Sequence, residues 1–475
     1  MLKALFLAAL AILSLIAVGH VLLHKRDPRA AFGWVVVCCV LPGLGALGYW
    51  LVGINRIRTR ARDWQAQLVR HGGAAAGFCS WSARQGHAVA FSDEGYGNLV
   101  SLADAVTRRP LLPGNRIAAL YNGEQAFPAM LQAIAEARQA VCLASYIFDT
   151  DVTGRAFVAA LKQAAERGVD VRVLVDGLGE RYSLPVVRRL FKGSAVAFAR
   201  FLPPSLSGRG LHFNLRNHRK LLIVDNWRGF TGGMNISDRH LAAGDRRSQA
   251  LDIHFGIEGP VVGQMREAFM EDWHFATGDV APPISCSPPL PGGTAFCRGI
   301  SAGPNEDFEK LRWIILSAIG CVRRRLRIMT PYFIPDRTLV AALNAAALRG
   351  VAVDIVLPAK NNLPYVGWAS RAYFAELLEH GCRIYYQPPP FVHSKLLLVD
   401  DQYALVGSAN LDPRSLRLNF EFNLEIFDSS LVASLTEHVD AVCVSAQQVT
   451  QEWLDNLPLV GRLRDSFAKL FSPYL

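Results

Sequence analysis

The sequence has few cysteines, and they follow no pattern typical of a disulfide framework or a metal site. Nine cysteines are spread over 475 residues, and no C-x-x-C pair occurs among them. Disulfide-stabilised domains need paired cysteines, and structural zinc sites need Cys or His ligands at short spacings. The sequence therefore argues against both classes and favours a reducing compartment for the soluble part of the chain.

Charged residues are absent from two stretches near the N-terminus, residues 4–23 and residues 30–55. Each stretch reaches the roughly 20 residues that a helix needs to cross a bilayer core. A cleaved signal peptide is the alternative for the first stretch, but no small-x-small cleavage site follows it. We therefore expect a hairpin of two transmembrane helices within residues 1–55.

Basic residues dominate the rest of the chain, which carries a formal net charge of +10. This excess favours an anionic partner, such as a membrane surface, a nucleic acid or a phosphorylated substrate. More basic residues lie outside the two apolar stretches than between them, so the positive-inside rule predicts a multi-pass protein with its catalytic part in the cytoplasm. The residues compared are Lys25, Arg26 and Arg29 between the stretches, and Lys3, Arg56, Arg58, Arg60 and Arg62 outside them.

One motif occurs twice, as NHRKLLIVDN at 217–226 and as FVHSKLLLVD at 391–400. Both copies read H-x-K, then four apolar residues, then aspartate, and an asparagine lies 17 residues after each histidine. A lone H-x-K at the head of a strand is ordinary, but a duplicated set with matched spacing indicates a site. The candidate catalytic residues are His218, Lys220, Asp225, His393, Lys395 and Asp400, with Asn235 and Asn410 as the matched asparagines.

The repeat extends beyond the motif, because residues 157–177 resemble residues 339–359. Each copy runs helix, strand, helix, strand and motif strand, an order that predicts a buried sheet with helices on both faces. We expect two pseudo-symmetric α/β/α sandwich units with largely parallel sheets. The expected boundaries are a connector at 56–112, a first unit at 113–280, a proline-rich linker at 281–293 and a second unit at 294–475.

The motif residues suit the chemistry of a phosphodiester. One imidazole can attack phosphorus while the other protonates the leaving alkoxide. Two lysines, helped by the amides of Asn235 and Asn410, can stabilise the charge on the phosphate oxygens. Since the lysines supply this charge, we expect no metal and no cofactor.

A nucleophilic imidazole also needs its second nitrogen held in place. Glu421 lies 28 residues after His393, and Asp252 is its expected counterpart in the first unit. We expect each carboxylate to orient a histidine across the interface between the units. Asp225 and Asp400 follow the motif strand, which favours a structural or orienting role. His212, His240 and His254 have no partners at matching spacing, and we interpret them as structural.

Further segments extend the similarity over essentially the whole chain: YIFDTDVTG, FTGGMNI, TPYFIPD, VGSANLDPRSLRLNFEFN and the C-terminal LFSPYL. With the duplicated motif and the N-terminal apolar stretches, the chain resembles the bacterial cardiolipin synthases of the phospholipase D superfamily. The resemblance implies a phosphatidyltransferase of the inner membrane that makes cardiolipin and glycerol from two phosphatidylglycerols. It also implies a phosphohistidine intermediate, with His218 as the nucleophile, and phosphatidylglycerol and anionic membrane lipid as partners.

Three other functions stay open on the sequence alone. A phospholipase D hydrolase would use the same motifs with water as the acceptor, and phosphatidylethanolamine could replace phosphatidylglycerol as a donor. A membrane-anchored nuclease would also use basic charge, but aromatic stacking platforms for bases are not evident, so we expect no nucleic-acid partner. A non-enzymatic scaffold is disfavoured because both motifs are intact.

Overall fold

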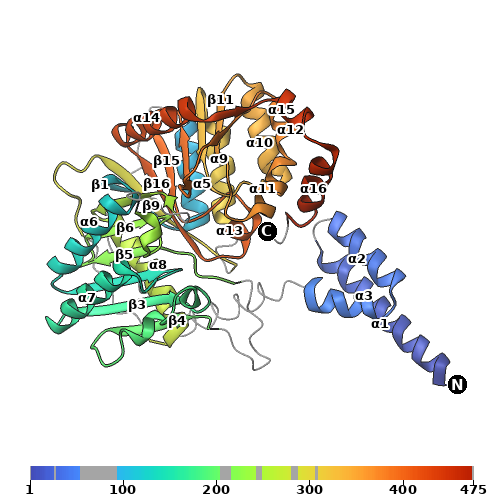
Figure 1. Ribbon diagram of the computed structural model, residues 1–475, viewed down its shortest axis with the longest axis horizontal. Coiled ribbons are helices and arrows are strands. Elements are labelled where there is room, and N and C mark those ends of the chain that lie inside the picture. Colours follow the sequence, from blue (N-terminus) through green and yellow to red (C-terminus); the bar gives the residue numbers. More distant parts are fainter. Residues whose placement is uncertain are drawn as a thin grey trace. The chain divides into compact units, whose positions relative to one another are not determined.

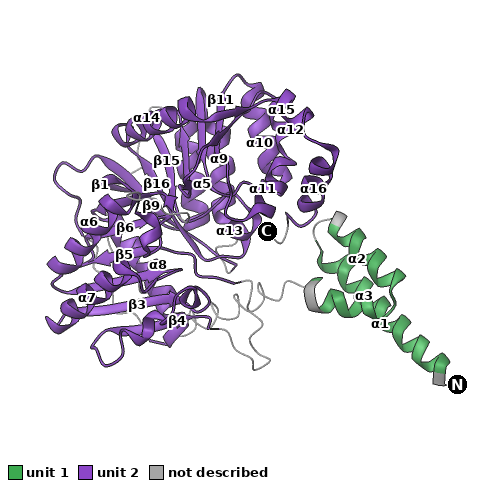
Figure 2. Cartoon of the chain, in the orientation of Figure 1, with its two compact units in different colours: residues 1–67 green, residues 68–475 purple. Residues whose placement is uncertain are grey.

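The computed structural model describes residues 2–25, 28–53, 94–203, 215–241, 249–279, 287–304 and 309–472 (Figure 1). The chain divides into two compact units, residues 1–67 and residues 68–475 (Figure 2). The smaller unit is helical, and the larger unit contains a mixed sheet with its helices.

The N-terminal unit contains one helix, α1 (Leu2–His24), that is long and apolar enough to cross a membrane. The second uncharged stretch is broken into α2 (Pro28–Val40), α3 (Leu44–Gly48) and a π-helical turn, η1 (Tyr49–Gly53). The break has a local cause, because Pro42 has no amide hydrogen and Gly43 adopts a positive φ of 81°. The second stretch is therefore not one continuous helix in the described residues, and the expected second transmembrane helix is not confirmed.

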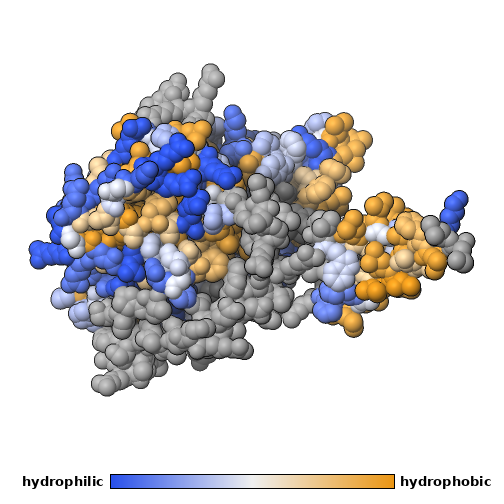
Figure 3. Space-filling model, turned by 90° about the horizontal axis from the view of Figure 1, so that it is seen from below, coloured by the Kyte–Doolittle hydropathy of each residue, from blue (hydrophilic) through white to orange (hydrophobic). Residues whose placement is uncertain are grey.

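The N-terminal unit has only a small core of its own, formed by Ala17, Val21, Cys38, Ala46 and Tyr49. Most of its other large apolar side chains are exposed, and its surface is apolar over much of its area (Figure 3). An apolar exterior around a small core is typical of helices solvated by lipid.

A fifteen-stranded mixed sheet organises the large unit, and its order is read from the two central strands outward. On one side lie β1 (Leu112–Tyr121), β8 (Ile253–Glu258), β6 (Arg228–Gly232), β5 (Leu221–Val224), β2 (Ala140–Ser145), β3 (Asp170–Asp176) and β4 (Ala197–Phe201). On the other side lie β9 (Ala295–Ala302), β16 (Glu421–Phe427), β15 (Tyr403–Gly407), β14 (Leu396–Val399), β10 (Arg325–Met329), β11 (Ala352–Pro358), β12 (Arg383–Gln387) and β17 (Gln447–Val449). The two halves match strand for strand apart from β17, as the sequence repeat predicts, and they join by antiparallel pairing of β1 with β9.

The expectation of largely parallel sheets is wrong. Only β2–β3, β3–β4, β10–β11 and β11–β12 pair in parallel within this sheet, and the other neighbours are antiparallel. Parallel strands need a long crossover, whereas three residues connect β5 to β6 and β14 to β15. The motif strands are therefore arms of hairpins.

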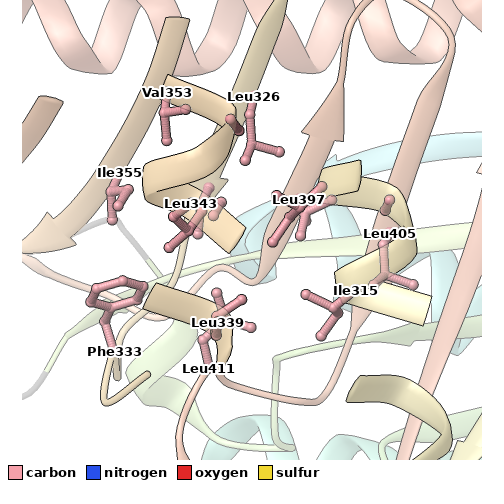
Figure 4. Packing of buried hydrophobic residues seen from close by; sticks show 14 of the residues in the cluster. Ile315, Leu326, Phe333, Leu339, Leu343, Val353, Ile355, Leu397, Leu405 and Leu411 are labelled. Atoms are coloured by element: carbon pink, nitrogen blue, oxygen red, sulfur yellow. The ribbon is translucent and has the colours of Figure 1, made fainter. Parts of the chain in front are cut away.

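Helices cover both faces of the sheet, which explains why four apolar residues follow each H-x-K. In β14, Leu397 and Val399 pack toward α9 (Lys310–Cys321) and α10 (Arg337–Leu348), as Figure 4 shows for Leu397. Leu396 and Leu398 point to the other face and join a core with α8 (Val261–Thr277) and α14 (Ser429–Ser445). In β5, alternate residues likewise face α8 or the pair α6 (Asn122–Glu136) and α7 (Val152–Glu166). A strand buried on both faces must be continuously apolar.

The two halves share a core rather than facing each other as separate domains. Side chains of α8, from the first half, pack in one cluster with those of β14 and β16, from the second. The predicted connector also contributes, because α5 (Glu94–Thr107) packs on α9 through Tyr96, Leu99 and Ala103. The rest of the connector up to residue 93, and residues 281–286 of the predicted linker, lie outside the described residues.

Shorter elements complete the large unit. They are η2 (Gly179–Tyr182), η3 (Val187–Arg189), η4 (Asp238–His240), β7 (Ala250–Leu251), α11 (Pro364–Arg371), α12 (Phe374–Glu379), β13 (Phe391–Val392), α13 (Pro413–Arg417), α15 (Gln451–Asp455) and α16 (Leu459–Lys469).

Candidate active site

Backbone pairing between the halves brings the two motif histidines to one place. The His218 amide donates to the Phe420 carbonyl at 2.8 Å, one residue before Glu421. In the other half, β13 pairs with β7, and the His393 amide donates to the Leu251 carbonyl at 2.7 Å, one residue before Asp252. Each motif is thus aligned with the segment that carries the acid of the opposite half.

Each histidine ring is held by the carboxylate from the opposite half. Nδ1 of His218 lies 3.0 Å from both carboxylate oxygens of Glu421. Nδ1 of His393 lies 2.9 Å from Oδ2 of Asp252. A carboxylate at Nδ1 keeps the proton on that nitrogen in the neutral ring and leaves the Nε2 lone pair for chemistry. The geometry across the interface is the one expected from the spacing.

The two carboxylates differ in their surroundings. The Ser408 hydroxyl donates to Glu421 at 2.5 Å, and the Asn419 amide donates to it at 3.1 Å. Burial raises the pKa of Glu421, but the charge and hydrogen bond of His218, with Lys220 and Ser408, outweigh it and leave the pKa below its usual value. Glu421 is therefore held in its charged form.

Asp252 receives fewer donors. Its Oδ1 accepts from the Ile253 amide at 2.8 Å, and burial raises the pKa of this carboxyl although Lys395 opposes the rise. The residue aligned with Ser408 in the first half is Gly233, where a Cβ would lie only 2.3 Å from Asp252 Oδ2. The glycine thus makes room for Asp252 where the other half supplies a hydroxyl.

The motif lysines lie within the same buried cluster. Lys220 Nζ donates to the His218 carbonyl at 2.8 Å, and Lys395 Nζ donates to the His393 carbonyl. Burial lowers the pKa of Lys220 to about 7 and that of Lys395 to about 8, against the opposing charges of the two site carboxylates. Burial also lowers the pKa of His218 and His393, and both lysines contribute in each case.

Asn235 and Asn410 are buried and are partly occupied with local structure. Oδ1 of Asn235 accepts from the Ile147 amide at 3.1 Å, and Nδ2 of Asn410 donates to the Ser415 hydroxyl at 3.2 Å. Oδ1 of Asn410 is buried, and no group in the described part of the chain donates to it. Phosphate binding by these two residues stays a prediction.

Asp225 and Asp400 lie at the far end of the motif strands and hold backbone. Asp225 accepts from the amides of residues 138–140 at 2.7–2.9 Å, and Asp400 accepts from those of residues 323–325 at 2.8–3.0 Å. Four strand residues lie between each lysine and its aspartate, so five residue steps place the two roughly 16 Å apart. Their grouping with the catalytic residues is therefore corrected to an orienting role, in which they tie the motif hairpin to the preceding strand.

Two of the three other histidines can be placed, and His212 lies outside the described residues. His240 accepts from the Asn235 amide through Nε2 at 3.2 Å and contacts the Ala250 carbonyl through Nδ1 at 3.2 Å. Burial lowers the pKa of His240 to about 3 and that of His254 to about 4. Both are neutral, and the structural interpretation of His240 is confirmed by its backbone contacts.

Sequence reasoning missed a buried network behind His218. Asp176 accepts from the Asn217 amide at 2.9 Å, and Asn217 donates its side-chain amide to Asp272 at 2.7 Å. Arg219 is fully buried, pairs with Asp272 and donates to the Glu421 carbonyl at 3.1 Å. The network fixes the residues on both sides of His218, and the polar Asn217 and Arg219 flanking the histidine were its sequence signal.

An aromatic wall beside the site was also missed. The ring of Tyr146 lies 5.2 Å from that of His218, and Lys220 Nζ lies 5.5 Å from the Tyr146 centroid. In the second half, Tyr332 lies 6.4 Å from Phe391. Tyr146 and Tyr332 are not equivalent in the repeat, because the bridges of Phe148 and Phe333 align Tyr332 with Ile147. Both nevertheless lie in the short segments that follow β2 and β10, and these aromatic segments were the sequence signal.

Metal ligands are not gathered anywhere in the described ranges, where no group of three His, Cys, Asp or Glu side chains has suitable geometry. The catalytic cluster instead consists of two imidazoles, two ammonium groups and two carboxylates. Such a set can carry out nucleophilic attack, proton transfer and charge stabilisation on a phosphodiester.

Comparison with known proteins agrees with this chemistry. The family described as "Cardiolipin synthase, PLD-like domain" matches residues 130–273 and 315–443, and "Phospholipase_D-nuclease N-terminal" matches residues 12–53. Cardiolipin synthase A of Pseudomonas aeruginosa is 32% identical over 474 residues, which cover 99% of this chain and 96% of the relative. The major cardiolipin synthase of Bacillus subtilis is 30% identical over 97% of both chains.

A solved structure shows the same fold. The crystal structure of a phosphatidylserine synthase of Haemophilus influenzae superposes with a TM-score of 0.63 and covers 80% of this chain and 100% of its own, at 18% identity. Two halves with reciprocal histidine–carboxylate pairs, an apolar N-terminal helix and relatives similar over nearly the full length lead to one conclusion. The chain belongs to the bacterial cardiolipin synthase family of the phospholipase D superfamily, and it is a membrane-associated phosphatidyltransferase.

Proposed function

We propose that this enzyme makes cardiolipin and glycerol from two phosphatidylglycerols through a phosphatidyl-histidine intermediate, with His218 as the nucleophile. The observation that carries the assignment is the difference between the two acids. A ring phosphorylated at Nε2 and protonated at Nδ1 is cationic, and it is stabilised by a carboxylate that stays charged. Glu421 meets this condition, because Ser408 and Asn419 donate to it and its pKa lies below its usual value, whereas the pKa of Asp252 is raised.

In the first step, Nε2 of His218 forms a bond to phosphorus, and the bond from phosphorus to the glycerol oxygen breaks. His393 enters this step as a cation protonated on both ring nitrogens and paired with Asp252. It gives its Nε2 proton to that oxygen, so glycerol leaves as the neutral alcohol and the ring becomes neutral. Lys220 and Lys395 stabilise the negative charge that gathers on the other phosphate oxygens. Burial strengthens this interaction, since the local dielectric is lower than that of water.

In the second step, a hydroxyl of the second phosphatidylglycerol loses its proton to Nε2 of His393 and attacks phosphorus. The bond from phosphorus to His218 breaks, cardiolipin is released, and both histidines return to their starting state. Asp252 stabilises the His393 cation before the first proton transfer and again after the second. Every charge in this cycle is met by side chains of the chain itself, so chelators should leave the initial rate nearly unchanged.

We further propose that the catalytic unit faces the cytoplasm, because Arg56, Arg58, Arg60 and Arg62 follow the apolar N-terminal region. The number of membrane crossings belongs to the same proposal. Labelling of single cysteines on either side of α1, and a reporter fused to the C-terminus, test both. A periplasmic C-terminus would reverse the sidedness and leave the chemistry unchanged.

The transfer reaction is tested with the purified full-length protein in vesicles that contain radiolabelled phosphatidylglycerol. We expect cardiolipin and glycerol in equal amounts, measured by thin-layer chromatography and mass spectrometry. An acid quench within the first turnover should place the label on the peptide that contains His218. Phosphatidic acid without cardiolipin would identify a hydrolase, and label on the His393 peptide would exchange the two roles.

A further inference from the structure

The last helix of the large unit, α16, is attached to the protein through one face only. Asp465 is buried and accepts from Arg371 of α11 at 2.7 and 3.0 Å. Lys469 Nζ lies 4.1 Å from the centroid of Tyr373, and Ala468 belongs to the main core of the second half. These contacts fix the orientation of α16 on α11.

The opposite face of α16 is apolar and exposed. Four large side chains of the helix are 61–79% exposed, and two more follow at its end: Leu459, Val460, Leu463, Phe467, Leu470 and Phe471. Their spacing of three, four and one residues places them on one stripe of the helix. Contiguous apolar surface of this kind marks an interaction site, whereas isolated exposed residues such as Leu348 and Val444 are ordinary.

The charges on α16 indicate what covers this face. Arg462 is exposed, and Arg464 is exposed in part while it lies 4.7 Å from the Trp368 centroid and pairs with Asp465. Asp465 is the one acid between residues 456 and 472. Asp465 is 3% exposed, so the surface of the helix presents cations and apolar groups without an exposed acid. A helix with a large apolar stripe flanked by arginines binds in the plane of a membrane whose headgroups are anionic.

A short chain of contacts links α16 to the wall of the active site. The loop before α11 is fixed by Asn361, which donates to the Pro331 carbonyl at 2.9 Å, and by Asn362, which accepts from the Tyr332 hydroxyl at 2.9 Å. Tyr332 lies beside Phe391, two residues before His393. Whatever surface α16 rests on is therefore held in a defined position relative to the site.

We propose that α16 is a second membrane contact, separate from α1, that lies in the plane of the bilayer with its apolar stripe between the headgroups of anionic phospholipids. It keeps the wall of the site at the lipid surface, so that donor and acceptor lipids enter by lateral diffusion. The docking depends on a lipid surface and not on which transfer the histidines catalyse. A second copy of the chain, or the N-terminal helices of the same chain, would be other occupants of the stripe.

Photo-crosslinking of the full-length protein in vesicles of phosphatidylglycerol and phosphatidylcholine distinguishes these occupants. Benzoylphenylalanine replaces Phe467 on the stripe or, as the matched control, Val444, an exposed apolar residue of α14. We expect labelled phospholipid to be captured at position 467 at least about ten times more than at position 444. Capture of a second chain, or of the N-terminal helices, in place of lipid would overturn the proposal.

The same measurement in the His218→Ala variant separates this proposal from the transfer mechanism, because crosslinking to lipid needs no turnover. Kinetics give a second test. The double variant Leu463→Asp/Phe467→Asp should raise the phosphatidylglycerol fraction needed for half-maximal rate by about five-fold or more and change kcat little. The control Leu348→Asp/Val444→Asp should change neither. If the α16 variant kept its melting temperature and needed the same phosphatidylglycerol fraction for half-maximal rate as the unchanged protein, the stripe would not bind lipid.

Discussion

The two halves of the large unit hold their histidines with the same backbone pairing but with different acids. His218 faces Glu421, which is fully buried and also accepts from Ser408 and Asn419. His393 faces Asp252, where Gly233 leaves room for the carboxylate and supplies no hydroxyl. Duplication fixed the positions of the rings, and the residues around each acid then made the two rings unequal.

The comparison shows that pseudo-symmetry and mechanism are compatible because the asymmetry lies one contact away from the reacting atoms. The nucleophile needs an acid that stays charged, and the proton-transfer residue needs one that lets the ring change its charge easily. The chain meets both needs with small changes of side chain, since glutamate and serine in one half correspond to aspartate and glycine in the other. Variants that make the two halves alike, or that remove a side chain from one half, test this asymmetry.

Loss of either histidine should have the largest effect. His218→Ala and His393→Ala should each lower turnover by about 10³-fold or more, because attack and proton transfer both need an imidazole. His380→Ala, at the end of α12, is the matched control.

A donor with a nitrophenol leaving group distinguishes the roles of the two histidines, since this leaving group needs no proton. It should give a single burst of nitrophenolate from His393→Ala and none from His218→Ala. A burst from His218→Ala alone would assign the nucleophile to the other half.

Neutralising the acids should have the next largest effect. Glu421→Gln and Asp252→Asn should each lower kcat by about 10²- to 10⁴-fold, because an amide favours the wrong tautomer and cannot balance a cationic ring. Glu421→Gln should also abolish the nitrophenolate burst, while Asp252→Asn should retain it. Stopped-flow absorbance measures both. Equal bursts from the two variants would mean that the acids are interchangeable and that the asymmetry has no mechanistic role.

Much of this arrangement could be predicted from the sequence, because the motif spacing is a strong constraint. The two motifs that begin at His218 and His393 predicted two pseudo-symmetric halves. The equal spacing from each histidine to Asn235 or Asn410 predicted that the segments after the motifs correspond. The contacts of Glu421 and Asp252 across the interface also followed, once both halves were taken to form one site.

Other features depend on tertiary contacts that spacing does not encode. The strand direction was wrong because three-residue hairpins after β5 and β14 override the α/β pattern of the rest of each half. Asp225 was grouped with the catalytic residues, although its carboxylate is taken by three backbone amides of a distant turn. Pro42 could be seen in the second apolar stretch, but the prediction of a transmembrane helix there was based on the absence of charged residues and gave the proline no weight.

Exchange of the small residues beside the acids should have an intermediate effect. Gly233→Ala places a Cβ 2.3 Å from Asp252 Oδ2, so the carboxylate must move away from His393, and we expect kcat to fall by about 10- to 100-fold. Ser408→Ala removes one hydrogen bond to the charged Glu421, and we expect kcat to fall by about ten-fold, the low end of the effect of such a bond. Gly320→Ala on α9 is the control, because nothing lies within 4 Å of its Cβ. A larger loss from Ser408→Ala than from Gly233→Ala would contradict the steric explanation.

The smallest expected effect is a shift of the alkaline limb of the pH profile, which compares the two lysines. Burial lowers the pKa of Lys220 to about 7 and that of Lys395 to about 8. Both ammonium groups are needed in the charged form, so kcat/KM should fall as the pH rises through this range. Lys220→Arg keeps the charge at position 220 and should move the alkaline limb upward by about one pH unit. Lys395→Arg should leave the limb where it is, because Lys220 has the lower pKa and still loses its proton first.

Stability should respond to pH in the opposite direction. Between these lowered pKa values and the usual value near 10.5, the unfolded chain binds more protons than the folded one, so the lysines make the free energy of unfolding increase with pH. Profiles of kcat/KM from about pH 6 to about pH 10, with thermal unfolding at the same points and in both variants, test the pair together. An alkaline limb that does not move in Lys220→Arg would show that another group titrates in this pH range. The pKa of Lys220 would then not lie below that of Lys395.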